Sequence, residues 1–239
     1  MSEIKTAMVL AAGLGTRLRP LTDNLPKPLI NIGGTPVIIR ILNMLHEAGI
    51  ERVVINTHYL AHMLETAVKA ATPVGMKVYF SYEETLLETG GGMKKALPLL
   101  GDDPYLVVNS DAVWMDEVKP LLKPLMAAFD GEKHDTLLAV VPLSETKAFL
   151  PLGDFKFNKK TKALDRVPPR EKWDVVVAGV YVMKPGVIMH EVSEKFSVNK
   201  CWDDLRAVGR LHGWLYTGRW REIGSHQGLE MARAMVAGV

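Results

Sequence analysis

The sequence is poor in several features that would place it in common classes of protein. Its single cysteine, Cys201, excludes an intrachain disulfide and a zinc site of several thiolates, and we expect a reducing compartment. No apolar run is long enough to cross a bilayer and no leader peptide is recognisable, so we expect a cytoplasmic protein without a membrane partner. The net charge of +2 provides no field for a polyanion, which argues against a nucleic acid partner.

Two common phosphate-binding motifs are missing from residues 8–28, MVLAAGLGTRLRPLTDNLPKP. Neither of the two glycines in this stretch is followed by the lysine of a Walker-type loop. Leu18 stands where the dinucleotide-binding fingerprint needs a small residue for helix packing. We therefore expect neither a P-loop nor an NAD-type cofactor.

The same stretch nevertheless has the chemistry of a phosphate cradle. Residues 6–12 are short and apolar, which is typical of a strand buried on both faces of a parallel sheet. Gly13 and Gly15 allow positive φ and close approach of the backbone, so that N–H groups converge on phosphate oxygens. Arg17 and Lys27 add positive charge. A plain glycine turn would explain Gly-Leu-Gly alone, but the added cations favour a triphosphate site.

The hydrophobic pattern predicts a Rossmann-like α/β fold, with a mostly parallel sheet and helices on both faces. A β-α-β-α-β order opens the chain, and ligands of such folds bind at the carboxyl ends of the strands. The length suits one domain over residues 1–239. We predict strands at 6–12, 52–56, 77–82, 105–109, 136–142, 174–183 and 213–217, helices at 36–48, 62–71, 93–100, 117–129, 186–196 and 202–209, and a last helix after residue 225.

Three further features are candidates for the site. Asp111 follows the strand at 105–109, where a carboxylate could hold Mg²⁺ together with phosphate oxygens. The glycine-rich block at 87–92 lies between a strand and the helix at 93–100, so we predict that its backbone meets a base or ribose at the amino terminus of that helix. Residues 143–173 are rich in proline, glycine and charge, and we predict a small β-rich flap there.

These motifs resemble those of a known family. The pattern G-x-G-T-R-L-x-P-L-T followed by P-K-P is similar to the signature of sugar-1-phosphate nucleotidyltransferases, which make nucleotide sugars and release pyrophosphate. The block LETGGG with KKALP behind it resembles the N-acetylmuramate-1-phosphate uridylyltransferases of peptidoglycan recycling. The resemblance implies a nucleoside triphosphate, UTP, and a sugar-1-phosphate as substrates and Mg²⁺ as the cofactor. It also implies that residues 1–142 bind the nucleotide and residues 143–239 the sugar phosphate.

The resemblance assigns roles to individual residues. Arg17, Lys27 and Asp111 are the expected catalytic residues, with Arg17 on the β- and γ-phosphates and Lys27 on the α-phosphate. Glu222 replaces the usual second metal aspartate, and its longer arm predicts a supporting, water-mediated contact to the metal held by Asp111. The expected nucleotide contacts are Ala12, Gly13, Gly15, Thr16, Arg17, Lys27, Glu88, Gly91 and Gly92, and the expected sugar-phosphate contacts are Asn109, Asp154, Gly179 and Tyr181.

The sequence departs from the family at two other places, and alternatives stay open. Leu86 stands where relatives that bind uracil often carry Gln, and residues 167–172 are the candidate for the place of a missing Glu-Lys-Pro motif. Guanylyltransferases acting on mannose- or heptose-1-phosphate share the Arg17 and Lys27 signature. A non-catalytic regulatory subunit would use the same fold. A monomer or a small homo-oligomer is expected.

Overall fold

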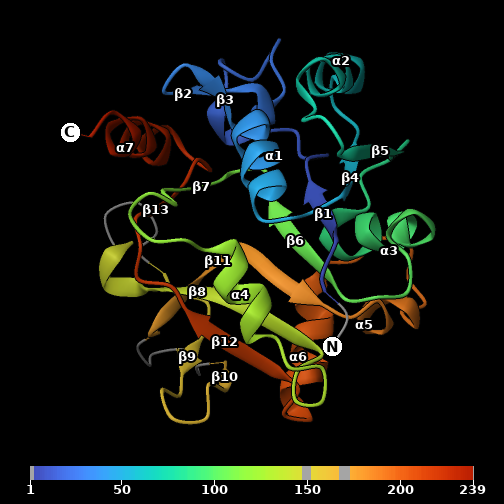
Figure 1. The fold of residues 1–239 in the computed structure, drawn as a ribbon, viewed down its shortest axis with the longest axis vertical. Helices are drawn as coiled ribbons and strands as arrows, with labels where there is room; N and C mark the ends of the chain where they lie inside the picture. The colour runs from blue at the N-terminus through green and yellow to red at the C-terminus, as the bar shows by residue number, and fades with distance from the viewer. Residues whose placement is uncertain (1–2, 147–151, 167–172, 239) are drawn as a thin grey trace.

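A seven-stranded sheet runs through the whole molecule (Figure 1). The computed structural model describes residues 3–146, 152–166 and 173–238. The strand order is β12-β8-β11-β6-β1-β4-β5, and only β11 runs antiparallel to its two neighbours in the sheet. The predicted mostly parallel sheet is confirmed. Its strands are β1 Thr6–Leu10, β4 Arg52–Thr57, β5 Lys77–Tyr82, β6 Tyr105–Asn109, β8 Thr136–Pro142, β11 Val175–Met183 and β12 Leu211–Leu215.

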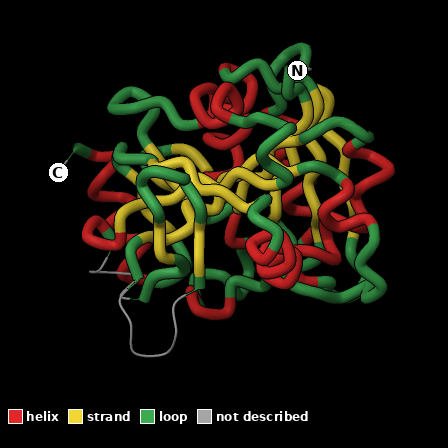
Figure 2. Tube along the Cα trace, turned by 90° about the horizontal axis from the view of Figure 1, so that it is seen from below, coloured by secondary structure: helices red, strands yellow, loops and turns green. Residues whose placement is uncertain are grey.

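Helices cover both faces of this sheet because its strands are apolar on both sides (Figure 2). In β1, Ala7 and Val9 join one apolar core, whereas Met8 joins the other. The first core is shared with α1 Val37–Glu47, α2 Ala61–Ala71, α4 Leu122–Ala128 and α7 His226–Ala237. The second is shared with α3 Glu88–Leu100, α5 Gly186–Met189, α6 Val198–Ala207 and the hairpin of β9 Lys156–Phe157 and β10 Leu164–Asp165.

Two helices are shorter than the sequence predicts. The helix predicted at 117–129 begins only at Leu122, because Asp116 ties down the preceding turn by accepting hydrogen bonds from Trp114 Nε1 and Leu121 N, and Pro120 disfavours helical backbone before it. The helix predicted at 186–196 ends at Met189. The chain then runs irregularly along α3 until the Ser197 hydroxyl caps α6 by accepting from Asn199 N.

Short elements outside the main sheet bring distant parts of the chain together. β7 Ala112–Trp114 pairs with β13 Trp220–Glu222 as an antiparallel ribbon, and β2 Asn31–Ile32 pairs with β3 Thr35–Pro36. Three single 3₁₀ turns lie at Thr16–Leu18, Lys27–Leu29 and Leu143–Glu145. The β7–β13 ribbon matters for the site, because it fixes residues near position 222 beside those that follow β6.

The topology creates a crevice beside β1. From β1 the chain builds outward to β4 and β5, and it then returns to place β6 on the other side of β1. Loops that leave β1 and β6 therefore diverge at the carboxyl ends of these strands, which is where open α/β sheets bind ligands. In register with one another, Leu10 of β1, Asn56 of β4 and Asn109 of β6 form the edge of this crevice.

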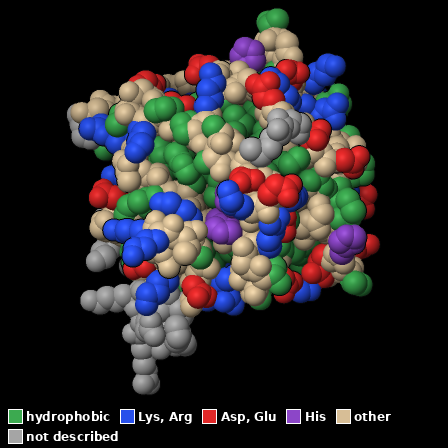
Figure 3. All heavy atoms as spheres, turned by 60° about the horizontal axis from the view of Figure 1, so that its bottom comes forward, with side chains coloured by type: hydrophobic (Ala, Val, Ile, Leu, Met, Phe, Trp, Pro, Cys, Tyr) green, Lys and Arg blue, Asp and Glu red, His purple; other side chains and the backbone are tan. Residues whose placement is uncertain are grey.

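The outer surface carries both signs of charge. Basic and acidic side chains are interspersed over the face shown in Figure 3. Within the described ranges, none of the helices combines the length and the apolar character needed to cross a membrane.

Candidate active site

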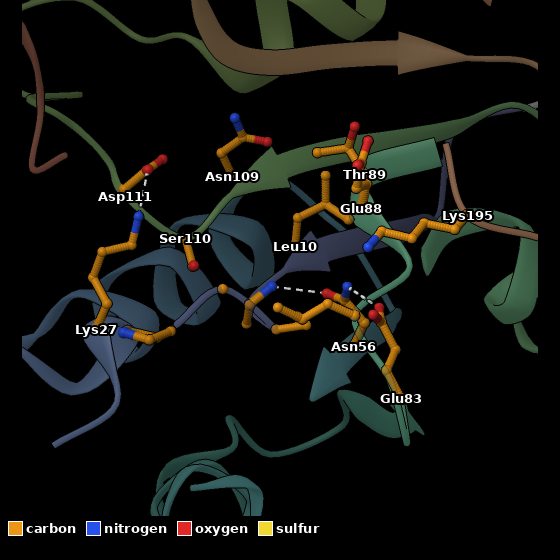
Figure 4. A pocket seen from close by; sticks show the side chains of 15 residues that line it. Leu10, Lys27, Asn56, Glu83, Glu88, Thr89, Asn109, Ser110, Asp111 and Lys195 are labelled. Atoms are coloured by element: carbon orange, nitrogen blue, oxygen red, sulfur yellow. Dashed lines mark hydrogen bonds and ion pairs between the residues drawn. The ribbon is translucent and has the colours of Figure 1, made fainter. Parts of the chain in front are cut away.

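A cavity of about 440 Å³ opens at the crevice beside β1 (Figure 4). Its floor is the end of β1 and the loop that follows, and its walls come from the ends of β4, β5 and β6, the start of α3 and one residue before α6. The lining residues are Leu10, Ala11, Ala12, Gly13, Lys27, Pro28, Asn56, Glu83, Leu86, Glu88, Thr89, Asn109, Ser110, Asp111 and Lys195. Six predicted site residues are among them, namely Ala12, Gly13, Lys27, Glu88, Asn109 and Asp111.

The two glycines of the predicted cradle play different parts. Gly15 has a φ of +66°, and a Cβ there would lie 3.0 Å from the Thr22 side chain, so this position needs glycine. The Thr22 hydroxyl holds the turn by donating to Gly15 O at 2.8 Å. Gly13 does not take positive φ, but a Cβ there would meet nothing within 4 Å, so a ligand can approach its backbone from the cavity. Of the two properties that glycine allows, Gly15 therefore uses positive φ, and Gly13 leaves room for close approach to its backbone.

Lys27 and Asp111 form an ion pair at one end of the cavity. Lys27 Nζ lies 2.6 Å from Asp111 Oδ2, and only 15% and 17% of their side chains are exposed. Burial by itself would raise the pKa of Asp111, but the charge and hydrogen bond of Lys27 outweigh it and hold the pKa below its usual value. A ligand in the cavity therefore meets the ammonium group of Lys27 and the carboxylate of Asp111 side by side.

Glu222 is brought beside Asp111 by the β7–β13 ribbon. Glu222 pairs with Ala112, and Ile223 N donates to Asp111 O at 3.0 Å. Burial and the negative charge of Asp111 raise the pKa of Glu222 to about 7. Arg17, whose side chain is 68% exposed, approaches from the cradle loop with Nη2 3.8 Å from Glu222 Oε1. The predicted charged residues thus converge, although Arg17, Glu222 and the cradle residues Gly15 and Thr16 lie next to the cavity rather than in its lining.

Asp111 and Glu222 supply donors that suit a magnesium ion bound together with phosphates. Mg²⁺ takes one or two carboxylates and completes its octahedron with phosphate oxygens and water. Across the described residues, no group of three His, Cys, Asp or Glu side chains could hold a metal by itself. Burial and the neighbouring charge of Asp111 both disfavour an ionised Glu222, and a cation between the two carboxylates would stabilise their ionised forms. The residues fit Mg²⁺, whose binding stays a prediction.

A buried polar network, which we did not predict, ties the cradle to α3. Ala11 N donates to Asn56 Oδ1 at 2.7 Å, and Asn56 Nδ2 donates to Glu83 Oε1 at 2.6 Å. Glu83 Oε2 then accepts from Leu87 N at 2.9 Å. Each buried polar group is satisfied, so the network rigidifies the floor of the cavity. The signal for Asn56 and Glu83 was their position at the carboxyl ends of adjacent strands.

The triple glycine lies inside the start of α3 rather than before the helix. We predicted a helix only from residue 93, and this boundary is wrong because α3 begins at Glu88. A Cβ on Gly90 would lie 2.3 Å from the Phe196 ring, and one on Gly91 would lie 2.1 Å from Glu194 O. A Cβ on Gly92 would lie 2.5 Å from Glu83 Oε1. The glycines are needed because neighbouring chain packs directly on the helix backbone.

The backbone of this turn is already hydrogen-bonded by the protein. Gly90 N and Gly91 N donate to Phe196 O at 2.9 and 3.1 Å, and Phe196 N donates to Leu87 O at 3.1 Å. Phe196 therefore satisfies two of the N–H groups that a helix start leaves unpaired. Gly91 and Gly92 do not line the cavity, so contacts from them to a nucleotide stay a prediction.

The predicted sugar-phosphate residues are spread over different depths. Asn109 lines the cavity, and Gly179, with a φ of +70°, packs against it where a Cβ would lie 3.0 Å from Asn109 Cβ. Asp154 Oδ2 accepts from Val177 N at 2.8 Å. Tyr181 is 1% exposed, and its hydroxyl donates to Met93 Sδ inside the core. Residues 167–172 lie outside the described ranges. The binding roles stay predictions, and the structure places only Asn109 in the cavity wall.

Comparison with known proteins agrees with this geometry. The profile of the family described as nucleotidyl transferase matches residues 6–237. Two proteins named N-acetylmuramate alpha-1-phosphate uridylyltransferase are similar to this chain. The one from Caulobacter vibrioides is 35% identical over 98% of this chain and 97% of its own length. The one from Neisseria meningitidis is 34% identical over 96% of this chain and 97% of its own length. A mannose-1-phosphate guanyltransferase of Aspergillus oryzae is 30% identical over 91% of this chain and 60% of its own length.

Solved structures agree on the fold. A crystal structure of UDP-glucose pyrophosphorylase complexed with UDP-glucose aligns with a TM-score of 0.81 at 18% identity, over 98% of this chain and 99% of that chain. The profile match, the relatives aligned over nearly their full length and the shared fold give one conclusion. The chain belongs to the nucleotidyl transferase family, and within it to the sugar-1-phosphate nucleotidyltransferases.

Proposed function

We propose that the protein transfers the uridylyl group of UTP to N-acetylmuramate 1-phosphate, giving UDP-N-acetylmuramate and pyrophosphate in peptidoglycan recycling. Transfer of a nucleotidyl group to a sugar-1-phosphate is the reaction of its family. The choice of substrates is supported by the similarity to two relatives with that name, each aligned over at least 96% of this chain. The observation that carries the proposal is the charged Lys27–Asp111 pair at one end of a cavity beside the cradle loop.

The residues suit an in-line displacement without a covalent enzyme intermediate. An oxygen of the sugar phosphate forms a bond to the α-phosphorus while the bond from that phosphorus to the β-phosphate oxygen breaks, and pyrophosphate leaves. The attacking phosphate is already ionised at neutral pH, so no general base is required. The protein therefore has two tasks, which are to position the reactants and to stabilise the charge on the transferring group.

Each charged residue has a place in this scheme. Lys27 faces the cavity and binds the α-phosphate and the incoming phosphate. Arg17, on the exposed rim of the cradle, binds the β- and γ-phosphates as they become pyrophosphate. Asp111 and Glu222 would hold Mg²⁺, which supplies neutralisation of the phosphate oxygens when it is bound. The Asn56–Glu83 network keeps the floor beneath the nucleotide rigid.

A guanylyltransferase is the second candidate, because a mannose-1-phosphate guanyltransferase is 30% identical. A panel of UTP, GTP, CTP and dTTP, each with N-acetylmuramate 1-phosphate, N-acetylglucosamine 1-phosphate and mannose 1-phosphate, separates the two. We expect kcat/KM for pyrophosphate release to be highest for UTP with N-acetylmuramate 1-phosphate, by about tenfold or more over the guanylyl pair. A higher value for GTP with mannose 1-phosphate contradicts the proposal. The Lys27→Ala variant sets the background of each assay.

A further inference from the structure

Residues 194–198 form a strap across the start of α3, and this strap carries a lysine into the cavity. Phe196 anchors it, because the buried ring packs on Gly90 and the backbone exchanges hydrogen bonds with Leu87, Gly90 and Gly91. Val198 N adds a hydrogen bond to Thr89 Oγ1 at 3.0 Å. These contacts hold the residues that follow Lys195, and on the other side Lys94 Nζ of α3 donates to Glu191 O at 2.6 Å, so the strap is tied to α3 before and after residue 195.

The Lys195 side chain points into the cavity from the side opposite Lys27 (Figure 4). Among the described residues, its ammonium forms neither a hydrogen bond nor an ion pair. The two carboxylates that line the cavity near this side are Glu83, whose oxygens accept from Asn56 and Leu87, and Glu88, which makes no ion pair with Lys195. A positive charge without a protein partner in a binding cavity suits an anionic group of the ligand.

The proposed acceptor, N-acetylmuramate 1-phosphate, carries one anionic group besides its phosphate. Lys27, Asp111 and the cradle loop lie at one end and gather the phosphates there. Uracil and ribose carry no charge, and neither does the acetamido group of the sugar. N-acetylmuramate differs from N-acetylglucosamine by a lactyl ether whose carboxylate is ionised at neutral pH.

We propose that Lys195 binds the lactyl carboxylate of the acceptor and so selects a sugar acid over a neutral sugar. This inference rests on the proposed function. It also links the glycines of α3 to substrate choice, since side chains at positions 90 and 91 would displace the strap that positions Lys195. Lys195 lies across the cavity from Lys27, so it can contact a group of the acceptor other than its phosphate, whereas the phosphate end does not distinguish one sugar phosphate from another.

The inference is tested by combining a variant of Lys195 with a substrate analogue that lacks the carboxylate charge. Lys195→Met and the wild type are each assayed with UTP and either N-acetylmuramate 1-phosphate or its lactyl carboxamide, which keeps the shape and removes the charge. We expect the wild-type kcat/KM to fall roughly 10- to 100-fold from acid to amide, and the Lys195→Met values to differ by less than about threefold. Lys195→Arg should keep most of the preference, because the charge is retained.

A matched control and the other outcomes make the test decisive. Lys95→Met removes the same charge from the exposed side of α3, outside this cavity, and should leave the preference for the acid unchanged. Equal losses for both substrates with a raised KM for UTP would show that Lys195 serves the nucleotide, and an undiminished preference in Lys195→Met would show that it serves neither. Both results overturn the inference and leave the proposed function standing. A wild type that does not use N-acetylmuramate 1-phosphate overturns both.

Discussion

Lys27 and Arg17 carry the same charge in different surroundings, so their removal should have different consequences. We predict that Lys27→Ala and Arg17→Ala each lower kcat about a hundredfold, since removing one charge contact to the transferring group costs roughly 3 kcal/mol. Lys27→Ala also leaves the mostly buried Asp111 without its partner, which should cost about 1–3 kcal/mol of unfolding free energy. Arg17 is 68% exposed, so its variant should unfold like the wild type. Pyrophosphate release and urea unfolding measure the two effects.

The control for this pair lies in the same loop. Arg19 is exposed and pairs with Asp23 on the surface, so Arg19→Ala should keep both activity and stability. Wild-type turnover in a folded Lys27→Ala or Arg17→Ala protein would rule out the phosphate cradle.

Asp111 and Glu222 should respond unequally to magnesium. Asp111 lines the cavity, whereas Glu222 lies beside it on the β7–β13 ribbon and has the longer arm. We therefore predict that Asp111→Asn raises the Mg²⁺ concentration for half-maximal rate by about tenfold or more, and Glu222→Gln by a smaller factor. Each variant is titrated with Mg²⁺ at saturating substrates. An unchanged Mg²⁺ curve with normal turnover for Glu222→Gln would remove it from the metal site.

At the scale of elements, α3 shows where sequence reasoning succeeded and where it failed. The sequence predicted a helix after the glycine run, but it placed the start of that helix at residue 93, whereas α3 already begins at Glu88 and includes the three glycines, which have low helix propensity. Tertiary packing overrode that propensity, since the strap with Phe196 and the carboxylate of Glu83 press on the helix where side chains would stand. Nothing local to residues 87–92 indicates that residue 196 packs there, because the contact spans more than 100 residues.

Substitution within α3 tests this account of the glycines. We predict that Gly90→Ala lowers the free energy of unfolding by about 1–3 kcal/mol, because its Cβ would lie 2.3 Å from the Phe196 ring and the strap must move. Gly186→Ala is the matched control, since α5 begins there and a Cβ would meet nothing within 4 Å, so stability should be unchanged or slightly raised. Urea unfolding of both variants gives the comparison. Equal stability of Gly90→Ala and the wild type would mean that the strap does not need this glycine.

At the scale of the whole molecule, the sequence predicted the layers better than the connections. The strands at 105–109 and 136–142 were predicted at their observed bounds, because apolar runs buried on both faces are a strong local signal. The strand at 77–82 was also predicted at its bounds, although it lies at the edge of the sheet and is mostly exposed or half-buried. Lys27 and Asp111 could be proposed as neighbours because both follow parallel strands that end at one edge. The Asn56–Glu83 network and the entry of Lys195 depend on contacts between separate loops, and no local pattern specifies those.

The sheet crosses the boundary that was predicted between a nucleotide part and a sugar part, and this bears on how the molecule unfolds. Residues 1–142 contribute β6 and β8, but β11 from the second part lies between them and pairs with both. Neither part can complete its sheet alone. We therefore predict one cooperative urea transition for the full chain.

Two probes report on this from different places. Far-UV circular dichroism follows the whole fold, whereas tryptophan fluorescence is weighted to the second part, which holds four of the five tryptophans, at positions 173, 202, 214 and 220. The two curves should coincide, and the fragment 1–142 should fail to fold because β6 and β8 would lose the strand between them. Separate transitions, or a cooperatively folded fragment, would show instead that the chain consists of two domains.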